Sequence, residues 1–250
     1  MGVALLDRRP QAATDVAKEI VETGGRAVAI ECDVLDRASL DSACKEVLAN
    51  FKSVDVLLNG AGGNNPRGTT SEETLIADHL GKHGPDIKTF FDLDADGFRF
   101  VFNLNFLGTL LPTQVFAEPM AAAGKGVIVN ISSMNAFRPL TKIPAYSAAK
   151  AAVSNFTQWL AVHLAPVGVR VNAMAPGFFL TDQNRFLLTE EKTGDLTARG
   201  NKIICHTPMG RFGVPEDLNG VLVWLCSDAS SFVTGVVVPV DGGFSAFSGV

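Results

Sequence analysis

The sequence predicts a single α/β domain, residues 1–250, built on a doubly wound parallel sheet. Short apolar runs rich in β-branched residues alternate along the chain with longer segments of helical pattern. Strands that alternate with helices are typical of parallel sheets covered on both faces. The length of 250 residues and the 47% apolar content fit one domain with a sizeable core.

Each element is expected from its own pattern. The predicted strands are Val3–Asp7, Ala27–Glu31, Val54–Asn59, Val127–Ser132, Val169–Ala175 and Val236–Pro239. The predicted helices are Gln11–Thr23, Arg37–Phe51, Ala95–Ala122, Ala145–Leu164 and Pro215–Cys226. Pro10 suits the first turn of a helix, and Pro215 with two following acidic residues is a good helix start.

Composition excludes several classes of function. The net charge of −5 and the pI near 5.4 argue against nucleic acid or an anionic membrane as partners. No uninterrupted apolar run reaches about 18 residues, so no membrane span is expected. Residues 1–25 lack the apolar core of a secretory signal. The scattered cysteines, Cys32, Cys44, Cys205 and Cys226, fit free thiols in a reducing cytoplasm better than disulfides or zinc.

The segment from Tyr146 to Lys150 carries the clearest chemical signal. Its spacing of four places both side chains on one helical face, one turn apart. A free phenol has a pKa near ~10, and a nearby ammonium is expected to lower it. The tyrosine would then exchange a proton with an alcohol or alkoxide near neutral pH. Taken alone, this spacing is common as ordinary surface pairing.

Two further polar residues belong beside this pair. Ser133 follows the predicted strand ending at Ser132, and ligands of open α/β sheets bind at the carboxyl ends of strands. Asn105 lies in the helical segment FNLNFLG. The predicted strand after the Tyr/Lys helix ends at Pro176-Gly177.

With these motifs in this order, the chain resembles the short-chain dehydrogenase/reductase family over nearly its whole length. The resemblance implies a Rossmann-like fold and an NAD(P)-dependent oxidoreductase. It implies that Tyr146 is the general acid/base and that Lys150 lowers the pKa of Tyr146 and holds the nicotinamide ribose. It further implies that Ser133 binds the substrate oxygen and that Asn105 keeps a water in the proton relay.

The same resemblance places the cofactor. ECDV is similar to the family's adenine contact, Asp33 and Val34, and LLNGAGG to its Asn-Asn-Ala-Gly segment. The latter gives Asn59 to Gly62, with Asn59, Gly60 and Ala61 as the expected cofactor contacts and Gly60 in place of the second asparagine. PGFFLT is similar to the segment that holds the nicotinamide carboxamide, and its cofactor residues would be Pro176, Gly177, Phe179 and Thr181.

Asp7 bears on the choice of cofactor. A carboxylate at the end of this strand would bind the adenosine ribose hydroxyls and repel a 2′-phosphate, which favours NAD(H) over NADP(H). Arg8 and Arg9 follow directly, and they could instead accommodate a phosphate.

The family's opening strand, glycine-rich turn and first helix have no counterpart ahead of Val3. These glycines let backbone amides approach the pyrophosphate. The loss would leave the strands at Val3 and Val54 without the neighbour they should share, with unpaired backbone groups. A misassigned start codon, a truncated gene, or an unusual pairing of the sheet would each explain it, and the first is favoured.

Two long segments, about 63–97 and 178–208, are expected to face the substrate, because connections of this length are usually functional. They resemble the family's D-mannonate oxidoreductase (fructuronate reductase) branch, which interconverts a keto sugar acid and its hydroxy acid. A sugar dehydrogenase and a 3-oxoacyl reductase are the alternatives. Substrate contacts are expected from Asn64, Asn65, Arg67, Asn135, Arg138, Gln183, Asn184 and Arg185, since arginine can grip a carboxylate with two hydrogen bonds.

Some features have plainer explanations. Arg138 equally suits a surface salt bridge. His79 and His83 are four apart, but Gly81 weakens a helix there and no third ligand is evident, so no metal site is expected. Phe98, Phe100, Phe102 and Phe106 are expected to pack a helix which, in this family, helps build a dimer or tetramer. The competing hypothesis is a catalytically silent fragment that acts as an interaction protein.

Overall fold

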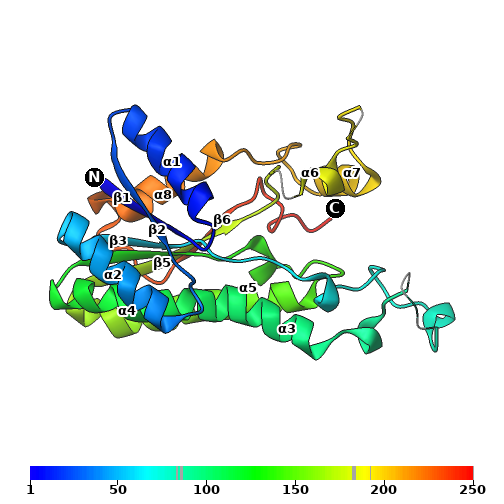
Figure 1. Ribbon diagram of the computed structural model, residues 1–250. Helices are drawn as coiled ribbons and strands as arrows, with labels where there is room; N and C mark the ends of the chain where they lie inside the picture. The colour runs from blue at the N-terminus through cyan, green and yellow to red at the C-terminus, as the bar shows by residue number, and fades with distance from the viewer. Residues whose placement is uncertain (83, 85–86, 182–183, 192, 250) are drawn as a thin grey trace.

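In the computed structural model, a layer of parallel strands lies between two layers of helices (Figure 1). The structure describes residues 1–82, 84, 87–181, 184–191 and 193–249. The strands are β1 (Gly2–Asp7), β2 (Arg26–Glu31), β3 (Val56–Asn59), β4 (Gly126–Ile131), β5 (Val169–Pro176) and β6 (Val237–Val240). All of their pairings are parallel.

The strands form two sheets. β1 pairs with β2, and β3, β4, β5 and β6 form a second sheet in that order. Among the described residues no pairing joins β1 to β3. The sequence predicted that these two strands would lack a common neighbour, and the structure has the sheet divided at this point.

The helices cover both faces. α1 (Pro10–Glu22) and α8 (Glu216–Cys226) lie on one face, and α2 (Arg37–Phe51), α4 (Gly108–Ala122) and α5 (Pro144–Leu164) lie on the other (Figure 1). The predicted bounds of strands and long helices hold to within two residues, apart from the stretch 95–122. That stretch is divided into α3 (Ala95–Phe102), a π-helical turn (Asn103–Leu107) and α4. The sequence analysis also missed the short helices α6 (Arg185–Leu188) and α7 (Ala198–Cys205).

The stretch Ala95–Ala122 is the most apolar long helical segment among the described residues. It contains an 18-residue window with mean hydropathy 1.3, which is long and apolar enough to cross a membrane. Half of that window is buried inside the protein. Met120, Ala117 and Val101 are buried in clusters with residues of other elements, so the stretch serves as a core helix.

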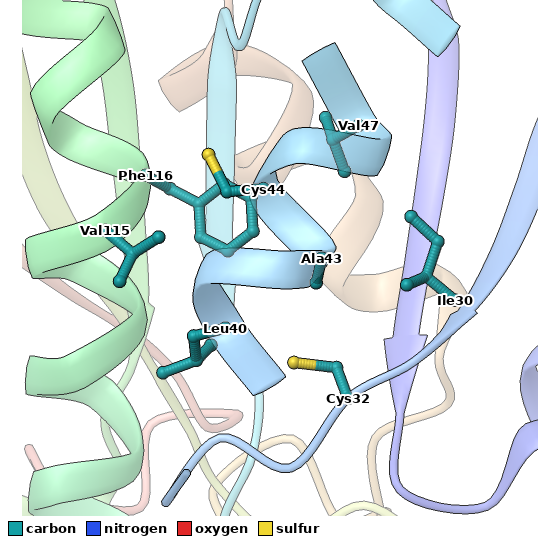
Figure 2. Close-up of a cluster of buried hydrophobic side chains, with 8 residues drawn as sticks. All are labelled: Ile30, Cys32, Leu40, Ala43, Cys44, Val47, Val115 and Phe116. Carbon is teal, nitrogen blue, oxygen red and sulfur yellow. The ribbon is translucent and has the colours of Figure 1, made fainter. Parts of the chain in front are cut away.

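The core under the sheets has two main parts. Around α2, buried side chains from β2, α2 and α4 meet (Figure 2), and Leu6 of β1 and Leu57 of β3 pack against the same cluster. A second cluster joins α4, β4, β5 and α5. On the opposite face, Val129 and Met174 pack with Leu225 of α8. The second cluster packs α5 against β4, and these two elements position Tyr146, Lys150 and Ser133.

Candidate active site

The residues predicted for catalysis meet where β4 ends. Ser133 follows β4 directly, while Tyr146 and Lys150 lie in the first two turns of α5. Asn105 lies in the π-helical turn, which packs against α5. Ser133, Lys150 and Asn105 are all buried. The structure therefore brings together the four residues that the sequence selected.

Lys150 is a buried cation with only 3% of its surface exposed. Its Nζ donates a hydrogen bond of 2.7 Å to the carbonyl oxygen of Ile131, at the end of β4. Burial disfavours the charged ammonium and lowers the pKa of Lys150 to about 8. The lysine therefore remains mostly charged at neutral pH and loses its proton just above it.

Tyr146 corrects the expectation of a lowered phenol pKa. Burial raises the pKa of Tyr146, and the hydrogen bond from Ser133 opposes this only in part. The Lys150 Nζ lies 5.7 Å from the centroid of the tyrosine ring, and it donates its hydrogen bond to the Ile131 carbonyl. Spacing alone placed the two residues on one helical face, but it overlooked the cost of burying a phenolate. At neutral pH the phenol is therefore protonated and ready to donate.

Asn105 is held by the loop that follows β3. Its Nδ2 donates to the carbonyls of Gly63 (2.7 Å) and Val101 (2.8 Å), and its Oδ1 accepts from the Gly63 N–H (3.2 Å). The π-helical turn places this side chain toward the loop, and such turns are frequent at functional sites. Gly62 is the neighbour that sequence analysis underrated: a Cβ there would lie 2.8 Å from Asn105 Oδ1 and 3.1 Å from Lys150 Nζ.

We predict that Gly62→Ala reduces kcat/KM at least about tenfold, because the new methyl group would displace the Lys150 ammonium or the Asn105 amide. Gly63→Ala is the matched control in the same loop. Its Cβ would meet only Leu104, at an ordinary 3.4 Å. Steady-state kinetics of both variants, with circular dichroism to confirm folding, test this. Equal losses in the two variants would contradict the steric account.

Lys150 also predicts a pH dependence of stability. Between pH 8 and 10.5 the unfolded chain keeps a proton on this lysine that the native protein has lost, so raising the pH favours the native state. Relative to Lys150→Met, the wild-type free energy of unfolding should therefore rise by about 3 kcal/mol across this range. Urea denaturation of both proteins at several pH values measures the difference. A difference that stays flat with pH would show that Lys150 is not buried as a cation.

The residues predicted to contact the adenine and the adenosine ribose have local partners. Asp33 Oδ1 accepts from the Leu35 N–H (2.9 Å), and Val34 packs near Gly108 at the start of α4. Asp7 Oδ1 accepts from the Arg9 N–H (2.7 Å), which holds the carboxylate at the end of β1. Gly60 and Ala61 follow β3 as an open loop. These residues lie near the carboxyl ends of the strands, the edge where dinucleotides bind.

Asn59, predicted to contact the cofactor, also has a structural role that the resemblance did not reveal. It is buried, and its Nδ2 donates to Thr113 Oγ1 and Asn130 Oδ1, both at 2.8 Å. Asn130 in turn donates to Thr157 Oγ1 on α5 (2.9 Å). This polar network ties β3 and β4 to the two helices beneath them. In the sequence its members are isolated polar residues within apolar runs, a pattern that could have indicated buried hydrogen bonds.

The segment after β5 forms the other wall of the site. At Gly177 a Cβ would lie 2.6 Å from the Asp241 backbone, so only glycine fits after Pro176. Asn184 bridges this loop from within: its Nδ2 donates to the Phe179 carbonyl (2.7 Å) and its Oδ1 accepts from the Thr181 N–H (2.8 Å). Asn184, predicted to bind substrate, thus holds the two predicted nicotinamide contacts together.

The other predicted substrate residues divide between positions near the site and positions away from it. Asn135 is buried beside Ser133, and its N–H donates to Ser133 Oγ (3.2 Å). Arg67 is exposed and pairs with Asp94 through its Nε (2.6 Å). Arg138 donates to the Ser245 carbonyl of the C-terminal tail (3.2 Å), in place of the surface salt bridge considered above.

Most of the remaining predicted substrate residues lie in loops, where Asn64 and Asn65 bond residues of the same loop. Asn64 donates to Thr69 Oγ1 (3.1 Å), and Asn65 accepts from the Arg67 N–H (2.9 Å). Arg185 begins α6. Gln183 and His83 lie outside the described residues. Among the described residues no three His, Cys, Asp or Glu side chains gather in a way that could hold a metal ion.

One ion pair, unforeseen from the sequence, joins the two long segments. Lys202 of α7 hydrogen-bonds Glu73, and this contact lowers the pKa of the Glu73 carboxyl. Both side chains are substantially exposed. The two segments predicted to face substrate therefore touch each other.

A parallel α/β fold with a buried Ser–Tyr–Lys set at a strand's carboxyl end defines a class of dehydrogenases and reductases. A family model described as "Enoyl-(Acyl carrier protein) reductase" matches residues 1–245. The chain belongs to the short-chain dehydrogenase/reductase family and is an NAD(P)-dependent oxidoreductase by that membership.

Several proteins resemble the chain over its whole length. An "Uncharacterized oxidoreductase" of Haemophilus influenzae is 54% identical over 99% of this chain and 86% of its own. The "Uncharacterized oxidoreductase UxuB" of Bacillus subtilis is 51% identical over 100% of this chain and 88% of its own. A crystal structure of a "putative D-Mannonate oxidoreductase" from Haemophilus influenza, with bound NAD, has a TM-score of 0.92. It is 54% identical, and the match covers 100% of this chain and 88% of the other.

Proposed function

We propose that this protein interconverts a keto and a hydroxy group on a sugar acid, D-fructuronate and D-mannonate, using NAD(H). The observation that carries the proposal is similarity over the whole of this chain, at 54% identity, to the structure described as a "putative D-Mannonate oxidoreductase" with bound NAD. The assembled Ser133–Tyr146–Lys150 site is consistent with it. Relatives near 30% identity include a sugar-acid dehydrogenase and a 3-oxoacyl reductase, which are the alternatives within the family.

The side chains have distinct roles in the reduction. Ser133 hydrogen-bonds Tyr146. Both side chains would bind the carbonyl oxygen of the substrate that is reduced. The nicotinamide, when bound, supplies the hydride. Because its pKa is raised, Tyr146 holds a proton at neutral pH and gives it to the oxygen as negative charge develops there. The Lys150 ammonium, held at Ile131, stabilises that negative charge from nearby.

The described residues offer places for the nicotinamide and adenosine ends of a dinucleotide. Gly62 leaves the space beside Lys150 and Asn105 open, which a Cβ would fill. The turn between β1 and α1 reads Asp7-Arg8-Arg9-Pro10, and the Arg9 N–H bonded to Asp7 Oδ1 holds that carboxylate at the end of β1. Lys150, Phe179 and Thr181 would hold the nicotinamide ribose and carboxamide, while Asp7 would face the adenosine ribose and favour NAD(H).

Asn135 is the residue we assign to the substrate's hydroxyl chain. It is only 4% exposed, and its Oδ1 is buried without a hydrogen-bond partner in the described residues. An unsatisfied buried acceptor is costly, and it lies on a residue whose N–H bonds the catalytic serine. A substrate hydroxyl next to the reacting carbonyl would satisfy it.

We predict that Asn135→Leu lowers kcat/KM for D-fructuronate about tenfold or more, while kcat/KM for cyclohexanone, which lacks hydroxyls, changes much less. The unhydroxylated ketone serves as the matched control, because it shares the reacting carbonyl only. Initial rates with NADH at 340 nm measure both. Equal losses on the two ketones would assign Asn135 to support of Ser133 alone.

We predict that Tyr146→Phe abolishes turnover, at least about a thousandfold, while NADH still binds, because only the proton donor is removed. NADH oxidation with a panel of keto sugar acids and an NADH binding titration provide the two readouts. Near-normal rates in this variant would refute the general-acid role. A wild-type protein that is folded but inactive on every acid would favour the silent interaction protein, an alternative supported by the divided sheet.

The protein is also proposed to form a homodimer or homotetramer. α5 carries exposed apolar side chains at Trp159 and Val162, and the Trp159 ring stacks on Phe156 and His163. An ordered aromatic row on an outer helix suits a subunit interface.

A further inference from the structure

Two segments that follow different strands meet at one carboxylate. Glu73, in the long segment after β3, pairs with Lys202 of α7, in the segment after β5. Because β3 and β5 are both parallel to β4, the two segments leave the sheet at the edge where the catalytic residues lie. The segment after β3 and helix α7 both lie beyond that edge, on the same side of the molecule (Figure 1). The Glu73–Lys202 pair therefore belongs to the surroundings of the candidate active site.

Glu73 is surrounded by more positive charge than one ion pair requires. The hydrogen bond from Lys202 is the largest cause of the lowered pKa of the Glu73 carboxyl. The charges of Lys142 and Arg199 lower that pKa further. Arg199 lies three positions before Lys202 on α7, so the two side chains share one side of the helix. We call Lys142, Arg199 and Lys202 the cation cluster.

The cation cluster stands out against the charge of the whole chain. It gathers three cations near one carboxylate, in a protein whose net charge is −5. Such a local excess of positive charge attracts an anion from solution and holds it at that place on the surface.

Lys142 connects the cation cluster to the catalytic helix. It lies two positions before the first residue of α5 and four before Tyr146. The Thr70 N–H donates to the Lys142 carbonyl (2.9 Å), which ties the long segment to the start of α5. The Lys142 side chain is half-buried. Among the described residues its ammonium has neither a hydrogen bond nor an ion pair of its own.

The backbone at Lys142 is unusual for a lysine. Its φ of 72° lies in the left-handed region, which glycine and asparagine adopt more readily. In the described part of the chain, Lys52 is the other non-glycine residue with a positive φ. Strained residues of this kind are concentrated at functional sites, where the side chain is needed in spite of the strain.

The arginines that the sequence offered for a substrate carboxylate have other partners. Arg67 pairs with Asp94 and lies 3.6 Å from Asp96. Arg138 donates to the Ser245 carbonyl. Lys142 and Arg199 are therefore better placed to accept a new anion than the arginines chosen by residue type.

We propose that the cation cluster binds the carboxylate of the sugar-acid substrate, with Lys142 as the contact nearest the catalytic residues. This inference rests on the proposed function and assigns the acid end of that substrate. In D-fructuronate three hydroxylated carbons separate the keto group from the carboxylate. Ser133, Asn135 and Lys142 lie in this order along the connection from β4 to α5, which suits the keto oxygen, a neighbouring hydroxyl and the carboxylate in turn.

The first test compares D-fructuronate with D-fructose, which has a neutral hydroxymethyl group in place of the carboxylate. We expect Lys142→Gln to lower kcat/KM for D-fructuronate about tenfold or more, mainly through KM, because a charged contact is lost. Lys142→Arg should stay within about threefold of wild type, because it keeps the charge. For D-fructose, Lys142→Gln should change kcat/KM less than about twofold.

Lys52→Gln is the matched control. Lys52 has a similar φ of 69°, but it lies at the end of α2. We expect this variant to behave as the wild type with both ketoses. The proposal is overturned if Lys142→Gln loses as much on D-fructose as on D-fructuronate, or if Lys52→Gln shows the same loss.

Calorimetric titration with D-mannonate in the presence of NADH separates this inference from the proposed function, because that complex undergoes no reaction. We expect the wild type to bind D-mannonate and Lys142→Gln to bind it about tenfold more weakly. If this result comes with no reduction of D-fructuronate, the cation cluster is supported and the proposed function fails. A wild type that binds no D-mannonate, or a Lys142→Gln variant that binds it equally well, would overturn the assignment of the cluster.

Discussion

The site depends on a single buried cation. The Lys150 ammonium is held by the Ile131 carbonyl at the end of β4, and it lies close to Gly62 and Asn105 from the loop and turn around it. Burial shifts the pKa of this lysine to about 8, so the protein keeps the cation at a considerable cost in free energy. Such costs are characteristic of functional sites, where charge must be present before the substrate arrives.

The rest of the catalytic half serves to place that cation. β4 ends at Ile131, whose carbonyl bonds Lys150, and α5 carries both Tyr146 and Lys150. The Asn59–Asn130–Thr157 network joins β3 and β4 to α5. The β1–β2 pair is joined to this half through packing on α2, and among the described residues no strand pairing links it to β3. The proposed catalytic residues are therefore attached to the four-stranded sheet, whereas Asp7, the residue proposed for the adenosine ribose, lies on the β1–β2 pair.

Local patterns predicted most elements because each strand is a short apolar run and each long helix begins with a clear signal. The places of the four proposed catalytic residues were also predictable, since Ser133, Asn105 and the Tyr/Lys pair stand at fixed positions relative to those elements. The burial of these side chains, and therefore the direction of their pKa shifts, was not predictable from the sequence. The raised pKa of Tyr146 arises from packing by α3 and α5, which spacing does not reveal.

Partners of polar loop residues were equally hidden. Arg67 suited a substrate carboxylate by type, yet Asp94, 27 positions along the chain, pairs with it. Asn184 was predicted to bind substrate from its residue type and position. In the structure its side chain bonds Phe179 and Thr181 of its own loop. The π-helical turn at Asn105 also escaped prediction, because an inserted residue in a helix changes the hydrophobic period only slightly.

Direct binding of the reduced cofactor tests the central claim, that this chain assembles a working nicotinamide site around Lys150. The measurement is a fluorescence titration of the full chain with NADH, with NADPH in parallel and circular dichroism to establish folding. The account predicts saturable binding that favours NADH. A folded chain that binds neither dinucleotide would contradict it.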